Sequence, residues 1–79
     1  MTIAEVKEKV IEIIRDGIEY EDEITPEMNL IEEIGISSLE SMVIIGELES
    51  EFGIELPISE VKTVSNIGEL QELVIKKLM

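Results

Sequence analysis

The sequence contains no cysteine, no histidine and no tryptophan, and its only aromatic residues are one tyrosine and one phenylalanine. Without cysteine the chain has no disulfide, no thiolate zinc site and no cysteine nucleophile. Without histidine it lacks the commonest general base and metal ligand. Most hydrolytic and metal-dependent enzyme classes are therefore excluded, and we expect neither catalytic residues nor a metal site.

Long apolar runs are also absent. The chain has 79 residues, which predicts one domain over residues 1–79 with a small core rather than a deep catalytic cleft. No apolar stretch is long enough to span a bilayer, and the first residues mix acids into their apolar positions, unlike a signal peptide. We expect a soluble, cytoplasmic monomer without membrane insertion.

Basic residues are scarce. The chain has 19 acidic residues against 6 basic ones, a formal charge of −13, and no Lys or Arg lies between Asp16 and Val61. This middle stretch must present a negative surface, which excludes nucleic acids and anionic membranes as partners because they carry the same sign. We expect basic proteins as partners, and a merely solubilising surface is the alternative.

The start of the chain is typical of an amphipathic helix. Thr2 and Glu5 form a capping box, which predicts a first helix from about Ile3 to Asp16 with Gly17 as its stop. Its apolar stripe consists of Ile3, Val6, Val10, Ile13 and Ile14.

Residues 18–36 show no sustained period and predict a long connection, pinned by Ile24, Leu30 and Ile34. A loop of this length in a small domain usually has a function or contains a short helical turn. A calcium-binding EF-hand loop is excluded, because Ile24 and Glu27 stand where that loop needs an oxygen ligand and a glycine.

A second capping box, Ser37 with Glu40, precedes the next apolar run and predicts a helix that ends near Gly53. Ser38 is then the first helical residue, and its hydroxyl is uncommitted and points outward. At 100° per residue, the core side consists of Ile44, Ile45, Leu48 and Phe52. The residues that fall away from the core are Leu39, Met42 and Val43, and those of a neighbouring acidic stripe are Glu40, Glu47 and Glu51.

Two further helices complete the predicted all-α fold. Pro57 starts a short third helix that runs to about Val64, and Asn66 with Glu69 caps a fourth. The apolar positions of the fourth helix are Leu70, Leu73, Val74 and Leu78.

An ordered set of short motifs runs through the stretch ITPEMNLIEEIGISSLESMVIIGELESEFGIELP. The motifs are Leu30, Ile34-Gly35, Ser37-Ser38-Leu39, Glu51-Phe52-Gly53 and Leu56-Pro57, followed without a gap by Asn66-Ile67-Gly68-Glu69-Leu70. In order and spacing they resemble the acyl carrier protein family, and the resemblance covers essentially the whole chain.

The resemblance implies a four-helix bundle of acyl carrier type that carries acyl groups as thioesters on a 4′-phosphopantetheine arm at Ser38. A separate phosphopantetheinyl transferase supplies the arm from coenzyme A, so the protein is expected to be a carrier and not an enzyme. The further partners implied are acyl transferases, synthases or ligases with basic docking patches, in fatty acid, polyketide or related biosynthesis. The aliphatic interior offers a shelter for the acyl chain, and Gly46 in mid-helix would permit a close approach by the loop or that chain.

We expect partner recognition by the second helix, through Ser37, Leu39, Glu40, Met42, Val43, Glu47 and Glu49. The family usually has Asp where Ser37 stands, and carriers of general fatty acid synthesis typically have an acid where Val43 stands. These departures favour a specialised carrier, whose apolar patch suits a partner with an apolar dimple in a basic rim. Two alternatives remain at this point: partial burial of Val43 by the long loop, and an unmodified acidic module that binds a basic partner.

Overall fold

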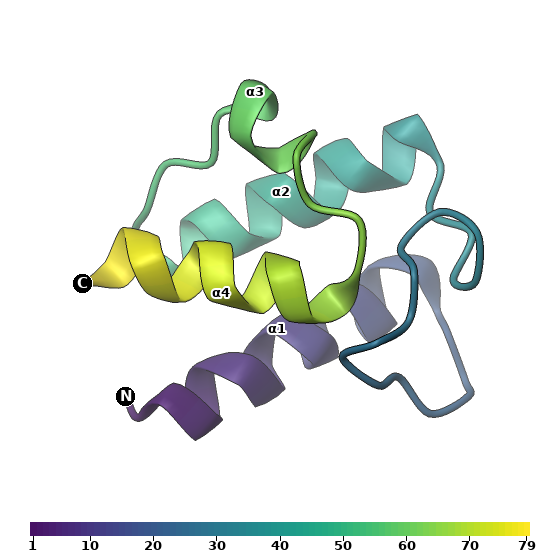
Figure 1. The fold of residues 1–79 in the computed structure, drawn as a ribbon, viewed down its shortest axis with the longest axis horizontal. Helices are drawn as coiled ribbons and strands as arrows, with labels where there is room; N and C mark the ends of the chain where they lie inside the picture. The colour runs from purple at the N-terminus through teal and green to yellow at the C-terminus, as the bar shows by residue number, and fades with distance from the viewer.

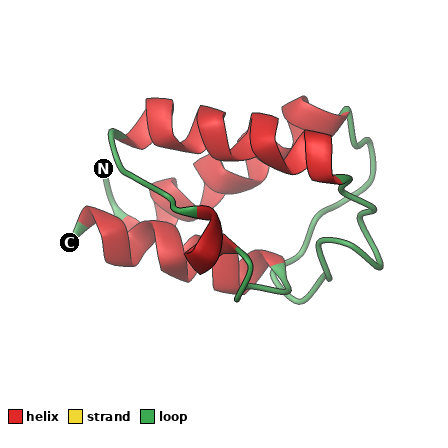
Figure 2. Ribbon diagram, turned by 90° about the horizontal axis from the view of Figure 1, so that it is seen from above, coloured by secondary structure: helices red, strands yellow, loops and turns green.

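Four helices make up the regular structure of the computed structural model, which describes every residue from 1 to 79. They are α1 (Ile3–Ile18), α2 (Ser38–Phe52), α3 (Ile58–Val61) and α4 (Ile67–Leu78). The helix α1 packs against both α2 and α4, while α3 is a single turn carried on extended segments beside α2 (Figure 1). Most of the loop between α1 and α2 gathers at the end of the bundle opposite the two termini (Figure 2). The predicted all-α fold is confirmed, and no helix is both long and apolar enough to cross a membrane.

All three long helices start with the predicted capping boxes, in which a side chain and a backbone N–H of each partner bond reciprocally. At α1, the backbone N–H and hydroxyl of Thr2 lower the pKa of Glu5 below its ordinary value of 4.5. At α4, the backbone N–H and hydroxyl of Ser65 both donate to Glu69 at 2.7 Å and lower the pKa of Glu69. These local bonds fix where α1 and α4 begin.

The predicted stop of α1 at Gly17 is wrong, because the helix continues to Ile18. The left-handed residue that ends it is Glu19, with φ 53°, whose N–H donates to the carbonyl of Arg15. Gly17 serves packing instead: a Cβ there would lie 3.2 Å from Cγ1 of Ile44, so the missing side chain lets α2 approach α1.

The core is entirely aliphatic apart from one amide. Gln71 is buried, and its side-chain N–H donates to the carbonyl of Lys7 at 3.0 Å, which satisfies the amide and ties α4 to α1. Ile3, expected on the apolar stripe of α1, is exposed at the end of the helix. The buried apolar residues are Val6, Val10, Ile13, Ile14, Ile24, Ile34, Ile36, Ile44, Leu48, Leu56, Ile67, Leu70 and Val74.

The long loop is fastened to the start of α4. The N–H of Leu30 donates to the carbonyl of Ser65 at 3.0 Å, and the N–H of Ile67 donates to the carbonyl of Met28 at 3.1 Å. Gly68 donates to the carbonyl of Pro26 at 2.8 Å, and a Cβ on Gly68 would lie 3.3 Å from that oxygen. The loop is therefore a fixed wall of the bundle, with Leu30 half-buried and the predicted anchors Ile24 and Ile34 buried.

Two expectations about local structure fail. The third helix is shorter than predicted, since Pro57 is its N-cap and its last α-helical bond runs from the N–H of Lys62 to the carbonyl of Ile58. Beyond it, the backbone N–H groups of Thr63 and Val64 donate to carbonyls three residues back, so the chain tightens into turns. The hydroxyl of Thr63 also donates to the carbonyl of Glu60, at 2.7 Å. The loop does not approach Gly46 either, because a Cβ there would meet no atom of the protein within 4 Å.

The capping box of α4 should make the stability of the protein depend on pH. Because the folded-state pKa of Glu69 is depressed, its contribution is present above the ordinary value of 4.5 and is lost as the pH falls through the folded pKa. We expect Glu69→Ala to lower the melting temperature at pH 7, and the difference from wild type to shrink below pH 4.5. Thermal unfolding followed by circular dichroism measures this, with Glu8→Ala on exposed α1 as control. A difference that does not change with pH would contradict it.

Candidate functional site

The first turn of α2 is built around Ser37. Its hydroxyl accepts a hydrogen bond from the N–H of Glu40 at 3.2 Å, and the Glu40 carboxylate accepts from the N–H of Ser37 at 3.0 Å. The hydroxyl of Ser41 donates to the carbonyl of Ser37 at 3.0 Å. Two of the three serines in this segment thus have committed hydroxyls.

Ser38 is the remaining serine, and the structure places it as predicted. It is the first residue of α2, it is exposed, and its side chain makes no hydrogen bond within the chain. Its hydroxyl lies at the end of the helix where unpaired backbone N–H groups carry partial positive charge, which favours an anionic substituent. The site thus combines a free nucleophilic oxygen with a local field suited to a phosphate ester.

Ser38 also lies at the edge of a cavity of about 660 Å³ between α2, α3, α4 and the long loop. Its lining is mostly apolar, with 11 hydrophobic residues among 16, and Lys62 is its only charged residue. The apolar lining residues are Leu30, Ile31, Ile36, Met42, Ile44, Ile45, Leu48, Ile58, Val61, Val64 and Leu70. The cavity therefore offers space for an aliphatic chain that begins near Ser38.

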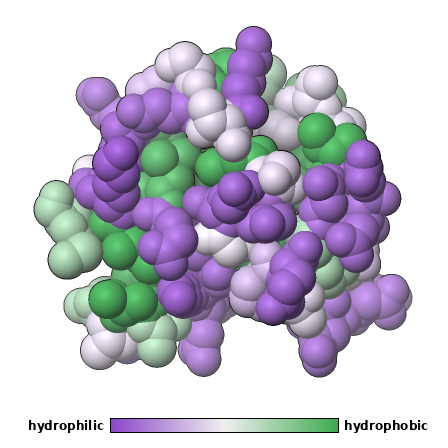
Figure 3. Space-filling view, viewed as in Figure 1, coloured by the Kyte–Doolittle hydropathy of each residue, from purple (hydrophilic) through white to green (hydrophobic).

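The outer face of α2 presents the predicted apolar patch. Leu39, Met42 and Val43 are 74%, 63% and 50% exposed, so each leaves half or more of its surface open to a partner. Glu47 is exposed one turn further along the helix. On the face shown in Figure 3, hydrophilic side chains dominate and apolar side chains are visible only in separate places.

Two of the predicted acidic recognition residues have structural partners. The Glu40 carboxylate belongs to the cap of α2, and the Glu49 carboxylate accepts from the N–H of Leu56 at 2.9 Å, which holds the segment after α2 against that helix. Both side chains are half-buried. Glu51, predicted in one acidic stripe with Glu40 and Glu47, has its Oε1 3.8 Å from Nζ of Lys9 in α1. Glu47 is left as the exposed acid of this face without an ion pair.

The sequence analysis missed Ile31 and Ile58. Both are exposed and line the cavity with Met42, yet Ile31 lies in the loop and Ile58 in α3. Only their exposed apolar character, beside a predicted helix start, would have signalled a role. Their position depends on how the loop and α3 pack against α2.

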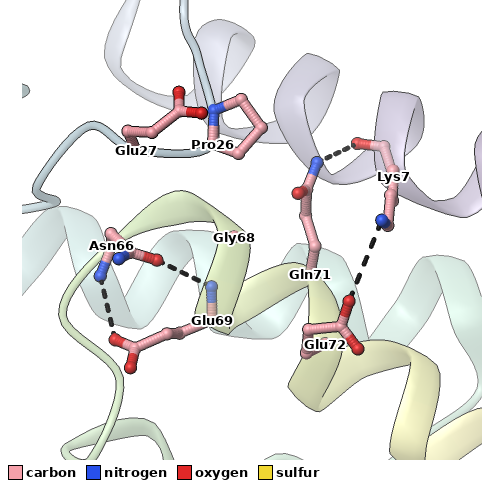
Figure 4. Close-up of a pocket in the computed structure, with 8 residues that line it drawn as sticks. All are labelled: Lys7, Pro26, Glu27, Asn66, Gly68, Glu69, Gln71 and Glu72. Carbon is pink, nitrogen blue, oxygen red and sulfur yellow. Dashed lines mark hydrogen bonds and ion pairs between the residues drawn. The ribbon is translucent and has the colours of Figure 1, made fainter.

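A second hollow, lined by no hydrophobic residue, lies where the loop meets α1 and α4 (Figure 4). Apart from Glu27, its polar side chains pair within the protein: Asn66 with Glu69, Gln71 with the carbonyl of Lys7, and Lys7 with Glu72 at 3.8 Å. The two contacts of Lys7 join α1 to α4, and the N–H of Gly68, which donates to the carbonyl of Pro26, joins α4 to the loop. The hollow is therefore part of the scaffold rather than a second site.

Comparison with known proteins identifies the class of site. The family model described as a phosphopantetheine attachment site matches residues 8–74 of this chain, a span that includes the start of α2 and most of the cavity lining. The chain belongs to the acyl carrier protein family. Such proteins hold 4′-phosphopantetheine and carry acyl groups, and they interact with biosynthetic enzymes and with a phosphopantetheinyl transferase.

Individual acyl carrier proteins resemble the chain along almost its whole length. Those of Chlorobium phaeobacteroides and Chlorobium phaeovibrioides are 34% and 33% identical, and each match covers 98% of this chain and 100% of the relative. The solved structure of a holo acyl carrier protein from Geobacter metallireducens has a TM-score of 0.79 at 27% identity, over 92% of this chain and 85% of that one. An acyl carrier protein candidate from Mycobacterium tuberculosis shares the fold, with a TM-score of 0.85 at 24% identity over 90% and 96% of the two chains.

Substitution of the two neighbouring serines should change the stability of the protein to different extents. Ser37→Ala removes the cap of α2 and should lower the free energy of unfolding by about 1 kcal/mol. Ser38→Ala removes a hydroxyl without a partner and should change it by less than about 0.5 kcal/mol. Urea unfolding of both unmodified variants measures this, and equal effects would contradict the assigned cap.

Proposed function

We propose that Ser38 is the residue that bears the 4′-phosphopantetheine arm. The observation that carries the proposal is its free, exposed hydroxyl at the first position of α2, between Ser37 and Ser41, whose hydroxyls are bonded. The Ser38 oxygen attacks the pyrophosphate of coenzyme A and forms a phosphate ester. The bond to the adenosine bisphosphate breaks, and the transferase takes the hydroxyl proton. When bound, the arm supplies a thiol, which this chain lacks, and holds acyl groups as thioesters.

The residues around Ser38 favour an attached phosphodiester. The start of α2 directs its unpaired N–H groups toward that position, and the partial positive charge of the helix end stabilises the negative group. Ser37 caps the helix without adding a charge beside the phosphate, in contrast to the Asp usual in the family. Lys62 at the cavity edge is the one base among the lining residues.

The cavity beside Ser38 gives the acyl chain an apolar site within the bundle. Its volume of about 660 Å³ lies in the range of small-ligand pockets, about 300–1,000 Å³. Transfer of the chain from water to this lining removes apolar area from solvent, which stabilises the loaded state by about 25 cal/mol for each Å² buried. The carrier thereby shields its cargo between enzymes.

The partners that fit the outer face of α2 combine apolar and basic groups. Leu39, Met42 and Val43 supply an apolar centre, and Glu47 supplies an exposed acid beside it. No base occurs anywhere on α2. We therefore propose that the transferase and the acyl transferases, synthases or ligases that use this carrier dock here through an apolar surface rimmed by Lys or Arg.

The attachment site is tested by intact mass after incubation with coenzyme A and a broad-specificity transferase. The wild type and Ser37→Ala should gain the phosphopantetheine increment, while Ser38→Ala should gain none. Circular dichroism before incubation ensures that each variant is folded. An increment on Ser38→Ala would refute the site, and no increment on the wild type would favour the unmodified interaction module.

The exposure of Val43 supports a specialised carrier that a general fatty acid synthase uses poorly. We expect Val43→Glu, which supplies the acid found there in general fatty acid carriers, to improve malonyl loading by the transferase of that system. Ile3→Glu on α1 is the matched control, because it adds the same charge at another exposed apolar residue. Malonyl-thioester formation and chain elongation with purified fatty acid enzymes measure the effect. Efficient elongation on the unaltered protein would contradict it.

A further inference from the structure

The wall of the acyl cavity formed by α3 is weakly anchored. Ile58, Val61 and Lys62 line the cavity from this side, yet no residue of α3 is buried, and the helix is one turn long. A single turn has little stability of its own, so its position depends on tertiary contacts. An extended segment leads into it, and turns follow it (Figure 1).

One charged contact ties α3 to α4. The ammonium of Lys77, in the last turn of α4, lies 2.7 Å from Oε2 of Glu60 in α3. The other ion pairs in the chain span 3.6 to 3.8 Å. The side chains of Lys77 and Glu60 are 28% and 42% exposed, so solvent screens the pair only in part.

The environment of Glu60 makes Lys77 its essential partner. Oε2 of Glu60 is buried and has no hydrogen bond of standard geometry, so the Lys77 ammonium is the group that compensates its charge. A buried carboxylate oxygen that loses its partner carries an uncompensated desolvation cost. Without Lys77, Glu60 would gain by turning toward water, and α3 would lose its one ion pair with α4.

We propose that Lys77 is a positioning residue that holds α3 over the cavity through Glu60, and that this ion pair sets how firmly the protein retains its acyl chain. The inference rests on the proposed function, in which an acyl group on Ser38 enters this cavity. A simpler role for Lys77 is to neutralise the negative end of the α4 dipole. Lys76 shares that role in the same turn but has no ion pair, which makes it the matched control.

The test compares the wild type with Lys77→Gln, Lys77→Arg and Lys76→Gln. Each protein is loaded from octanoyl- or acetyl-coenzyme A by the broad-specificity transferase, and intact mass establishes the loading. Hydroxylamine then cleaves the thioester, and the loss of acyl mass with time gives the rate. The acetyl group is too short to occupy the cavity and reports the intrinsic reactivity of the thioester.

We expect the octanoyl thioester of the wild type to be cleaved more slowly than the acetyl thioester. Lys77→Gln should speed octanoyl cleavage about two- to fivefold, the range for a partly exposed ion pair, and leave acetyl cleavage unchanged. Lys77→Arg should restore the wild-type rate, and Lys76→Gln should match it. High salt should bring the wild type toward Lys77→Gln.

Three results would overturn the proposal: equal octanoyl rates in the wild type and Lys77→Gln, an equal increase in Lys76→Gln, or no protection of octanoyl over acetyl in the wild type. The failure of the proposed attachment site is a separate result, because it leaves no acyl mass on Ser38. If Lys77→Gln proves unfolded by circular dichroism, Glu60→Gln, which keeps the shape without the charge, must speed octanoyl cleavage. An unchanged rate in that variant overturns the proposal as well.

Discussion

The site depends on the reciprocal hydrogen bonds between Ser37 and Glu40 at the start of α2. They fix the residue at which the helix begins, and with it the rotational phase of every side chain that follows. Ile44 and Leu48 consequently turn into the core, while Leu39 and the residues near it turn outward. The same bonds consume the Ser37 hydroxyl, so the adjacent serine is the one whose oxygen is free to react.

The cavity depends on the packing of the long loop. Backbone bonds from the loop to the start of α4 hold Leu30 and Ile31 next to the first turns of α2. On the other side of the cavity, α3 contributes apolar side chains, and its Glu60 forms an ion pair with Lys77 of α4. A rigid side and a weakly held side thus enclose one space, an arrangement suited to a cargo that must enter and leave.

The parts of this structure that follow from short-range chemistry could be predicted from the sequence. The three capping boxes define helix starts within a few residues, and the periodicity of α2 correctly separates Leu48 inside from Leu39 and Val43 outside. The same local reasoning singled out Ser38 and left its modification to experiment. The serine-rich cap and the spacing of apolar residues carry most of that information.

The failures share one cause, which is dependence on contacts between distant segments. Gly17 lies inside α1, where its missing side chain leaves room for Ile44 of α2. Glu49 turns from the expected recognition face because the N–H of Leu56 lacks another partner. The roles of Ile31 and Lys77 arise only once the loop and α3 are in place. No local pattern encodes these contacts.

The charge of the protein is unevenly distributed along the chain. Of the 6 bases, none lies on α2, and the excess of acids gives a net charge of −13, whose field attracts groups of positive charge. In the proposed function, long-range attraction brings the partner and the apolar side chains near Ser38 select it. The hydroxyl of Ser38, the proposed attachment point, lies at the start of this helix.

The most direct test of this account is to locate the phosphopantetheine on the wild-type holo protein. Cleavage after glutamate yields the peptide IGISSLE, residues 34–40, which contains both neighbouring serines. Tandem mass spectrometry of that peptide distinguishes fragments that break between Ser37 and Ser38. The account predicts that the whole increment is on Ser38, and an increment on Ser37 or on any other serine of the chain would contradict it.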